Sequence, residues 1–348
     1  MSEFQISCPR PLHDQDRILL GHGGGGRLMN QLIRERLIPR LSPERDGPLH
    51  DAAVIPVNGQ KIAFTTDSYV INPIFFPGGD IGQLAVHGTV NDLCMAGARP
   101  LHLSLGLILE EGFPIRDLEV VTESIAAAAA ATGVSVVTGD TKVVDKGKGD
   151  GIYINTAGIG LIEHDQHISP AAPRPGDAVI LSGDIGRHGM AIMAVREGLS
   201  FESDITSDSA PVWACVRALL QAGITIRCLR DLTRGGLASA CNEIAEAAHM
   251  GIRLREDAIP VREDVRAACE ILGMDPLYVA NEGRFIAFVP NAEAASAVTA
   301  LRATALGSAA TVIGHCADDP DHLVTLKNPL GHDRIIDMLS ADQLPRIC

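Results

Sequence analysis

The sequence predicts an α+β fold, with helices packed on sheets in an α/β sandwich-like manner, divided into two domains. Runs rich in β-branched residues alternate irregularly with runs of helical periodicity, which is typical of α/β and α+β proteins. The 348 residues also exceed the length of one ordinary domain. The proline-rich segment SPAAPRPGDA at 169–178 follows a series of expected strands, so we place the domain boundary there.

The expected elements follow one another along most of the chain. The helix with six consecutive alanines is expected to stop at Gly133, because glycine readily adopts the left-handed conformation that ends helices. Strands are expected at 61–71, 101–109, 134–140, 152–162 and 177–186, and helices at 82–98, 116–132, 190–198, 212–222, 235–250, 262–272 and 292–305.

Composition excludes several classes of function. The formal net charge of −14 repels a phosphate backbone, and no basic run offsets it, so we expect no nucleic-acid partner. No apolar run approaches the roughly 18 residues of a membrane helix, so we expect no membrane partner. The N-terminal residues contain no apolar stretch of the secretory type. Together these features predict a soluble, cytoplasmic protein.

The eight cysteines are scattered and form no CxxC pair, so neither a zinc site nor a disulfide framework is expected. Most lie in apolar surroundings typical of buried thiols. Cys8 and Cys348 differ, because one lies in a polar segment and the other is the last residue of the sequence. Before Cys348 we expect a short helix that Pro345 cannot continue, so that the final three residues form a free end.

The run GHGGGGRLMNQLI offers a candidate phosphate-binding segment. Backbone N–H groups of Gly23, Gly24 and Gly25 could approach phosphate oxygens closely, with a helix N-terminus behind them. The run matches neither the Walker motif nor the dinucleotide-binding motif. From these residues alone, a flexible surface loop is an equally good interpretation.

Four aspartates each end or interrupt an apolar segment: Asp51, Asp67, Asp92 and Asp140. A carboxylate in such a place is costly unless it is paired or bound to a metal, and Mg²⁺ prefers oxygen ligands. Any one of them could be a helix cap or a turn residue. Four in one half of the chain favour a metal–phosphate site.

Other residues could take part in binding or proton transfer. Lys142, close to Asp140, suits a phosphate contact or proton transfer, although a surface lysine is the alternative. Glu282 could act as a base, or could simply pair with Arg284. His188 is a further candidate, and Arg234 precedes a helix start that could bind an anion.

The segments TTDSYV, GDIGQLAVHGTVNDLCMAGARP, TGDTKVV, DLTRGGL and NEGRF resemble, in this order, the ATP-binding superfamily of aminoimidazole ribonucleotide synthetase and selenophosphate synthetase. The glycine-rich N-terminal segment and the closing PRIC narrow the resemblance to the hydrogenase maturation carbamoyl dehydratase family, of the HypE type. The resemblance spans essentially the whole chain. It implies a two-domain aminoimidazole ribonucleotide synthetase-like fold, with ATP between the domains. The implied segments are a glycine-rich segment (1–45), an ATP-binding and dimerisation domain (46–168), a C-terminal α/β domain (169–327) and a mobile C-terminal tail (328–348).

The resemblance also implies a reaction. The family's terminal cysteine, here Cys348, accepts a carbamoyl group from a carbamoyltransferase, and ATP with Mg²⁺ then drives dehydration of the S-carboxamide to a thiocyanate. The cyanide passes to a hydrogenase maturation scaffold complex that serves a [NiFe]-hydrogenase, and the enzyme is expected to be a homodimer. The implied catalytic residues are Cys348, Lys142 and Glu282; the implied ATP-binding residues are Gly23, Gly24, Gly25, Asp67, Asn91, Asp140 and Thr141; the implied metal ligands are Asp51, Asp67, Asp92 and Asp140.

Two alternatives stay open from the sequence. A selenophosphate synthetase-like enzyme would carry a reactive cysteine and a lysine close to its glycine-rich segment. Here Cys8 lies 13 residues before Gly21 and has no lysine neighbour, which weakens that interpretation. A non-catalytic ATP-binding carrier would not need the set formed by the aspartates, Lys142 and Glu282.

Overall fold

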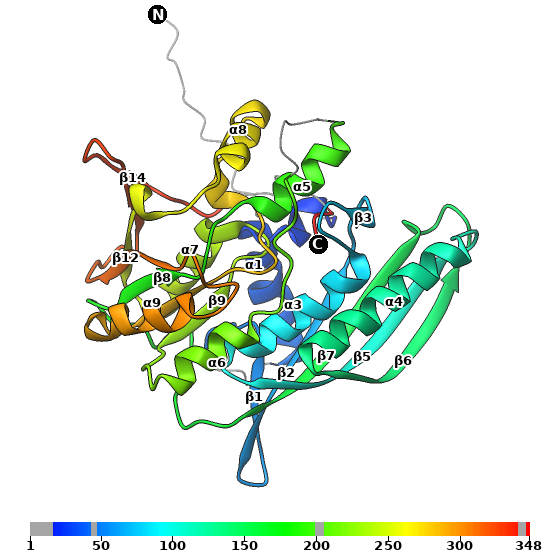
Figure 1. Ribbon diagram of the computed structural model, residues 1–348, viewed down its shortest axis with the longest axis horizontal. Helices are drawn as coiled ribbons and strands as arrows, with labels where there is room; N and C mark the ends of the chain where they lie inside the picture. Colours follow the sequence, from blue (N-terminus) through cyan, green and yellow to red (C-terminus); the bar gives the residue numbers. More distant parts are fainter. Residues whose placement is uncertain (1–16, 43–46, 199–204, 340–345) are drawn as a thin grey trace, which may run out of the picture.

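The computed structural model describes residues 17–42, 47–198, 205–339 and 346–348. They form two units, each built on its own sheet, with helix α3 (Ile81–Met95) packed between them (Figure 1). A two-stranded ribbon of β3 and β4 lies just before α3. This arrangement brings residues from both halves of the chain to one junction.

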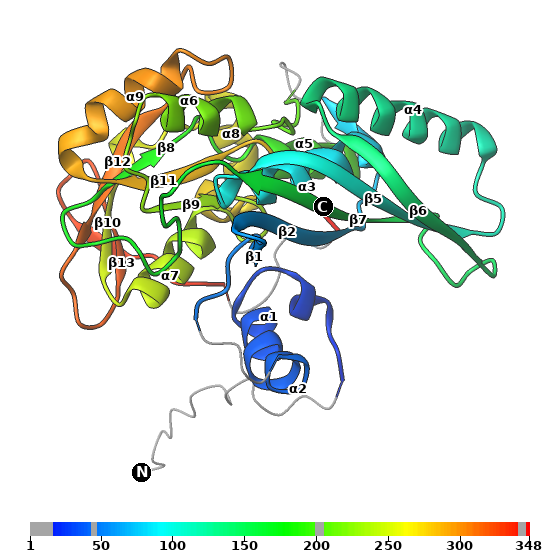
Figure 2. The same cartoon turned by 90° about the horizontal axis from the view of Figure 1, so that it is seen from below.

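The N-terminal sheet has five strands in the order β1-β2-β7-β5-β6. Neighbouring strands are antiparallel except β5 and β6, which are parallel. Helices α3 and α4 lie on one face of the sheet (Figure 2). The bounds are β1 Ala53–Val57, β2 Gln60–Tyr69, β3 Phe75–Phe76, β4 Gly79–Asp80, β5 Arg99–Glu110, α4 Ile115–Thr132, β6 Ser135–Val144 and β7 Ile152–Ile162.

Helix α3 occupies the middle of the molecule, and 13 of its 15 residues are buried. The Asp80 carboxylate caps its first turn by accepting hydrogen bonds from Gly82 N at 2.7 Å and Gln83 N at 3.1 Å. Gly88 lets the helix approach β2, because a Cβ there would lie only 3.0 Å from Cζ of Tyr69. A helix buried on all sides can carry polar residues such as Asn91 and Asp92 into the interior.

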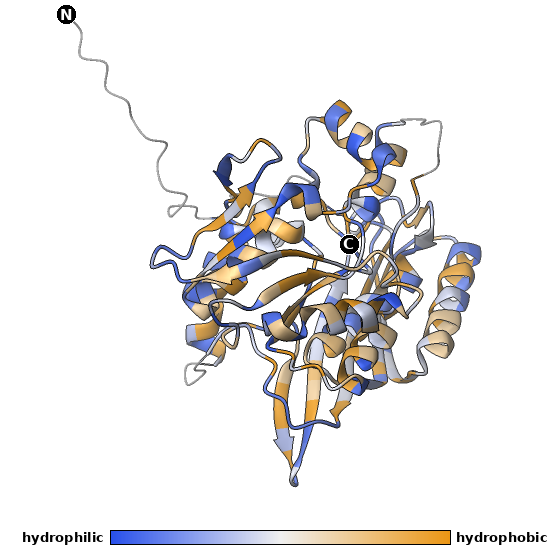
Figure 3. Ribbon diagram, turned by 60° about the vertical axis from the view of Figure 1, so that its left-hand side comes forward, coloured by the Kyte–Doolittle hydropathy of each residue, from blue (hydrophilic) through white to orange (hydrophobic). Residues whose placement is uncertain are grey.

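The C-terminal sheet has seven strands in the order β14-β13-β10-β12-β8-β11-β9. Every residue of β8 and β11 is buried, which explains their continuous apolar sequences. Figure 3 shows this concentration of hydrophobic residues along the strands and mixed colours on the helices. The bounds are β8 Ala178–Leu181, α5 Arg187–Arg196, α6 Trp213–Gln221, β9 Cys228–Asp231, α7 Gly236–Ala248, β10 Gly251–Arg255, α8 Glu263–Leu272, β11 Phe285–Val289, α9 Ala294–Arg302, β12 Thr311–Ala317, β13 Val324–Lys327 and β14 Asp333–Ile335.

The glycine-rich segment leads into short helices. They begin beside Leu339, near the C-terminus of the chain. Arg27 N donates a hydrogen bond to Leu339 O at 2.9 Å. No helix among the described residues is both long and apolar enough to cross a membrane. The bounds are a 3-10 turn Leu20–Gly23, α1 Arg27–Gln31, a π-helical stretch Leu32–Leu37 and α2 Ile38–Leu41, with further 3-10 turns at Glu256–Ala258, Pro276–Tyr278 and Asn291–Glu293.

The helix expected in the C-terminal tail is wrong for the residues that the structure describes. Residues 333–335 form β14, which pairs antiparallel with β13. Ile336 N then donates to Val324 O at 2.8 Å, and the Ile336 side chain is buried. Strand β13 therefore supplies hydrogen-bond partners for the backbone of this segment, which belongs to the second unit. The helix-stopping Pro345, like Cys8, lies outside the described residues.

The central strand β11 should carry much of the stability of the second unit. Ile286 is fully buried, whereas Ile271 on α8 is 66% exposed. We expect Ile286→Ala to lower the free energy of unfolding by about 2–5 kcal/mol, because it leaves a cavity. The matched Ile271→Ala variant should change it by less than about 0.5 kcal/mol. Urea denaturation measures both, and equal midpoints for the two variants would contradict the assignment of this core.

Candidate functional site

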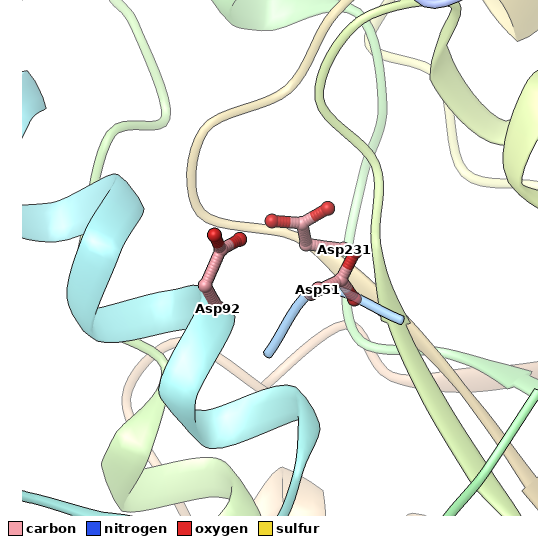
Figure 4. Close-up of side chains that lie close together, drawn as sticks. All are labelled: Asp51, Asp92 and Asp231. Carbon is pink, nitrogen blue, oxygen red and sulfur yellow. The ribbon is translucent and has the colours of Figure 1, made fainter. Parts of the chain in front are cut away.

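Three carboxylates meet at the junction of the two units. Asp51 precedes β1, Asp92 lies on α3 and Asp231 ends β9. One carboxylate oxygen from each lies within 4.8 Å of the others. Figure 4 shows the three side chains facing one another from their separate elements. We call Asp51, Asp92 and Asp231 the aspartate cluster.

Burial and mutual repulsion perturb the aspartate cluster. Burial raises the pKa of Asp92 well above its usual value, and the charges of Asp67 and Asp231 raise it further. Burial, followed by the charge of Asp51, raises the pKa of Asp231 to about 8. Like charges held this close favour proton uptake unless a cation compensates them.

Arg230 compensates one member of the cluster. Its guanidinium forms ion pairs with Asp51 and, at 2.5 Å, with Glu243. Burial alone would raise the pKa of Asp51, but Arg230 and His50 more than offset burial and lower it. Asp51 therefore stays ionised, whereas its other carboxylate oxygen, Oδ2, is buried without a hydrogen-bond partner among the described residues. Such an atom is available to a cation.

Asp67 lies beside the aspartate cluster on β2. Its Oδ2 accepts a hydrogen bond from the Tyr69 hydroxyl at 3.0 Å. Burial raises the pKa of Asp67, and the positive charge of Arg234 opposes that rise. Asp67 is thus close both to Arg234 and to the aspartate cluster.

Glu282 is a further buried carboxyl group at this junction, in the loop before β11. It is 3% exposed, and its Oε1 has no hydrogen-bond partner among the described residues. Burial raises its pKa well above the usual value, and the charges of Asp231 and Asp208 add to the rise. A carboxyl group with a raised pKa suits proton transfer near neutral pH.

Cys348 lies close to the same groups. The backbone at Val70 N donates to Cys348 O at 3.1 Å, which anchors the end of the chain next to Tyr69 and β2. The charge of Cys348 is the first cause of a raised pKa at Arg234, and the charges of Asp67 and Glu282 contribute. Arg234 is therefore a half-buried cation close to the end of the chain and to two carboxyl groups.

The glycine-rich segment lies over Arg234. The guanidinium donates from Nη1 to Gly23 O at 2.7 Å. Gly25 has φ +74°, and a Cβ there would lie 2.7 Å from the Arg234 carbonyl oxygen. Gly24 and Gly25 are buried, whereas Gly23 is exposed. The glycines thus allow this close packing beside the site.

The Asn91 side chain links helix α3 to two segments of the second unit. Its Nδ2 donates to Ala210 O at 3.0 Å and to Glu282 O at 3.2 Å, and its Oδ1 accepts from Val212 N at 2.9 Å. The side chain thereby ties α3 to the loop that carries Glu282. In this structure Asn91 therefore holds the Glu282 loop against α3.

Asp140, Thr141 and Lys142 are exposed on β6. Strand register places Asp140 and Lys142 on the face of the sheet opposite to Asp67. Residues paired across a sheet share a face, so Asp67, Thr156, Leu105 and Gly139 lie on one face, whereas Ser68, Asn155, Gly106 and Asp140 lie on the other. Lys142 shares the face of Asp140, and its Nζ lies 3.5 Å from Asp140 Oδ2. A single chain therefore does not bring Asp140 or Lys142 to Asp67.

Asp231 and Arg230 are site residues that the sequence patterns above do not predict. The segment DLTRGGL begins with Asp231, a carboxylate at a strand end, which is the same signal that predicts Asp51, Asp67, Asp92 and Asp140. No sequence signal distinguished Arg230, because only the fold places it beside Asp51.

The aspartate cluster fits a hard divalent cation. It offers carboxylate oxygens from three elements, one of them buried and unpartnered, and a cation would offset the repulsion that raises the pKa of Asp92 and Asp231. Asp51, Asp92 and Asp231 would hold Mg²⁺ in one chain, with Asp67 next to them.

Family comparisons cover both units. The N-terminal domain of AIR synthase related protein matches residues 49–162, and its C-terminal domain matches residues 174–327. The chain is 53% identical to carbamoyl dehydratase HypE from Azotobacter vinelandii over 327 residues, which cover 94% of this chain and 96% of that protein.

Solved structures give the same match. The structure of hydrogenase maturation protein HypE in complex with ATP superposes with a TM-score of 0.80 at 46% identity, covering 95% of this chain and all of the other. The HypE–HypF complex contains a chain with a TM-score of 0.84 at 44% identity, covering 88% of this chain and 99% of that one.

Magnesium should stabilise the fold through the aspartate cluster. A ligand at about a hundred times its dissociation constant adds about 2.7 kcal/mol. We expect MgCl₂ to raise the thermal midpoint of the metal-free protein, and Asp92→Asn to lose most of that rise. Because bound Mg²⁺ must displace the proton of Asp231, whose pKa is about 8, the rise should grow as the pH increases from about 6.5 to about 8.5.

Differential scanning calorimetry with and without EDTA measures these effects. Asp333→Asn is the control, because this exposed carboxylate lies on β14, outside the aspartate cluster. It should keep the full rise. An equal rise in Asp92→Asn and wild type would show that Mg²⁺ binds elsewhere.

Proposed function

We infer the function from one premise: this chain belongs to the carbamoyl dehydratase HypE family. The family predicted from the sequence motifs, and its two-domain AIR synthase-like fold, are confirmed. The chain is therefore an ATP-dependent carbamoyl dehydratase of hydrogenase maturation.

The proposed substrate is the S-carboxamide carried by Cys348. The sum of the reaction is Cys348–S–C(=O)NH₂ + ATP → Cys348–S–C≡N + ADP + phosphate. The C–O bond breaks and the carboxamide oxygen leaves in phosphate, the two N–H protons are removed, and the C≡N bond is completed. The observation that carries the proposal is that Val70 N anchors Cys348 next to Tyr69, whose hydroxyl donates a hydrogen bond to Asp67.

ATP supplies the γ-phosphoryl group that turns the carboxamide oxygen into a good leaving group. Asp51, Asp92 and Asp231 are the residues that would hold Mg²⁺ for the phosphates, together with Asp67. The glycine-rich segment 23–25 lies over Arg234 and would border the nucleotide. A solved HypE relative binds ATP, which supports ATP as the nucleotide here.

Glu282 is the proposed base. Once ionised, its unpartnered Oε1 would accept a proton from the carboxamide nitrogen. Its raised pKa makes it a stronger base than an exposed glutamate, so proton transfer costs less. Arg234 would stabilise the negative charge that develops on the substrate oxygen during dehydration.

Asp140 and Lys142 are proposed to act through a homodimer, whereas Thr141 lies on the opposite face of β6, the face of Asp67, and stays a predicted ATP-binding residue. The sheet face that carries Asp140 and Lys142 also exposes apolar side chains, and exposed apolar surface of this kind is typical of an interface. A second chain covering this face would bring its own Asp140 and Lys142 to the site. The exposed apolar residues on that face are Ile55, Phe64, Ile108 and Ile159.

The proposed partners are a carbamoyltransferase, which supplies the carbamoyl group, and a maturation scaffold complex, which accepts the cyanide. A HypE relative forms a complex with HypF, which supports the first. The chemistry requires the second, because a protein thiocyanate has to be discharged before Cys348 can react again.

Two variants should separate the two chemical steps. With the carbamoyltransferase and its substrates, Cys348→Ala should gain no carbamoyl group. Glu282→Gln should be carbamoylated but should lose water at least about a hundredfold more slowly when Mg-ATP is added. Intact-mass spectrometry follows both steps. Glu270→Gln, an exposed glutamate on α8, is the matched control and should behave like wild type. Dehydration at the wild-type rate in Glu282→Gln would remove this residue from the mechanism.

Subunit mixing should reveal whether Lys142 acts across the dimer. Lys142→Ala and Cys348→Ala chains should each be inactive alone. In a mixed dimer, the one remaining Cys348 would face an intact Lys142 only if that lysine comes from the other chain. Randomly mixed dimers should therefore recover about a quarter of the wild-type thiocyanate yield. No recovery, with mixed dimers verified by mass, would place Lys142 in the site of its own chain.

A further inference from the structure

The last three residues of the chain are held in place by a set of backbone contacts. Asn72 N donates to Arg346 O at 3.3 Å, and Val70 N donates to Cys348 O at 3.1 Å. Arg196 binds the carbonyls of Asn72 and Arg346. Ile347, between the two anchored residues, is 3% exposed and packs in the main hydrophobic core. We call residues 346–348 the docked end.

His188 on α5 holds the middle of the docked end. The imidazole is fully buried, and its Nε2 lies 2.7 Å from Ile347 O, whereas Nδ1 lies 2.8 Å from Ser207 Oγ. A carbonyl oxygen only accepts, so Nε2 must carry the proton. In the neutral ring Nδ1 then accepts from the Ser207 hydroxyl, whose oxygen accepts from Ser209 N at 3.0 Å. The donors and acceptors form one consistent chain.

The surroundings fix the orientation of this ring. Phe76 meets the imidazole edge-on, with ring centroids 5.5 Å apart and an interplanar angle of 89°. Ser207 is itself held by a hydrogen bond from its N to Pro77 O at 2.8 Å. Gly78 leaves room for it, because a Cβ there would lie 2.9 Å from Ser207 N. The imidazole N–H therefore points at the Ile347 carbonyl with little freedom.

We propose that His188, aligned by Ser207, is a positioning residue that holds the docked end through the Ile347 carbonyl and so keeps Cys348 next to Arg234 and Glu282 for dehydration. This inference rests on the proposed function. Carbamoylation by a separate protein requires the thiol to be accessible, whereas dehydration requires it beside the site. His188 contributes only to the docked arrangement, so its loss should affect the two steps differently.

The test replaces the imidazole without removing its ring volume. His188→Phe has no N–H donor, so undocking would no longer break this hydrogen bond, and we expect iodoacetamide to alkylate Cys348 about tenfold faster. Dehydration of the carbamoylated protein should slow by a similar factor, while carbamoylation and ATP binding stay at wild-type levels. His188→Gln offers an amide donor and should restore part of both effects. Peptide mapping assigns alkylation to Cys348, and intact mass follows dehydration.

His87→Phe is the matched control. His87 is also buried, and its Nδ1 lies 3.1 Å from Ser209 Oγ in the same loop, but it belongs to α3 and, among the described residues, forms no hydrogen bond with the docked end. It should change neither alkylation nor dehydration. If His188→Phe does not fold, Ser207→Ala tests the same chain of hydrogen bonds and should shift both rates in the same direction.

The outcomes are distinct. Unchanged alkylation and dehydration in a folded His188→Phe protein would overturn the proposal, as would equal changes in His87→Phe. Slower dehydration without faster alkylation would also overturn it, because His188 would then act other than by docking. If wild-type Cys348 accepts no carbamoyl group, the proposed function fails, while the alkylation comparison still decides whether His188 holds the docked end.

Discussion

Negative charge is buried where the two units meet, and the arrangement of the site depends on how that charge is compensated. Asp51, Asp92 and Asp231 come from three separate elements, and burial together with mutual repulsion raises the pKa of the latter two. Arg230 compensates Asp51 from within the fold. The remaining charge favours a divalent cation, so the repulsion that raises these pKa values would also give the cluster its affinity for metal.

Helix α3 and the docked end bring the reactive groups to this charged junction. Because α3 is buried on nearly all sides, it can bring Asp92 to the cluster while Asn91 secures the loop of Glu282. Arg234 binds the glycine-rich segment through Gly23 O and interacts electrostatically with Cys348, Asp67 and Glu282. Besides Arg230, a second half-buried cation therefore lies near the place where the substrate would be attached.

Much of the site could be predicted from strand-end carboxylates, because a charge that interrupts an apolar run requires compensation. Asp51, Asp67 and Asp92 are carboxylates of this kind, and the fold brings them to one junction. Asp140 is another, but strand register turns it to the opposite face of the sheet. Asp231 also ends a strand, but the glycines and the arginine that follow it are the more conspicuous features of its segment. Pairing of β14 with β13 likewise replaced an expected helix, because a sheet edge offered backbone partners that periodicity cannot reveal.

By itself the sequence determined the family, the two-domain fold, the order of most helices and the residue types available for a metal–phosphate site with a reactive thiol. These properties follow from local residue patterns and from the order of the motifs, and both can be read directly from the sequence. Only the tertiary structure decided which carboxylates are neighbours, which guanidinium compensates them, and that His188 binds the carbonyl next to Cys348. Distances between residues 159 positions apart depend on how strands pair and helices pack, and no local pattern encodes them.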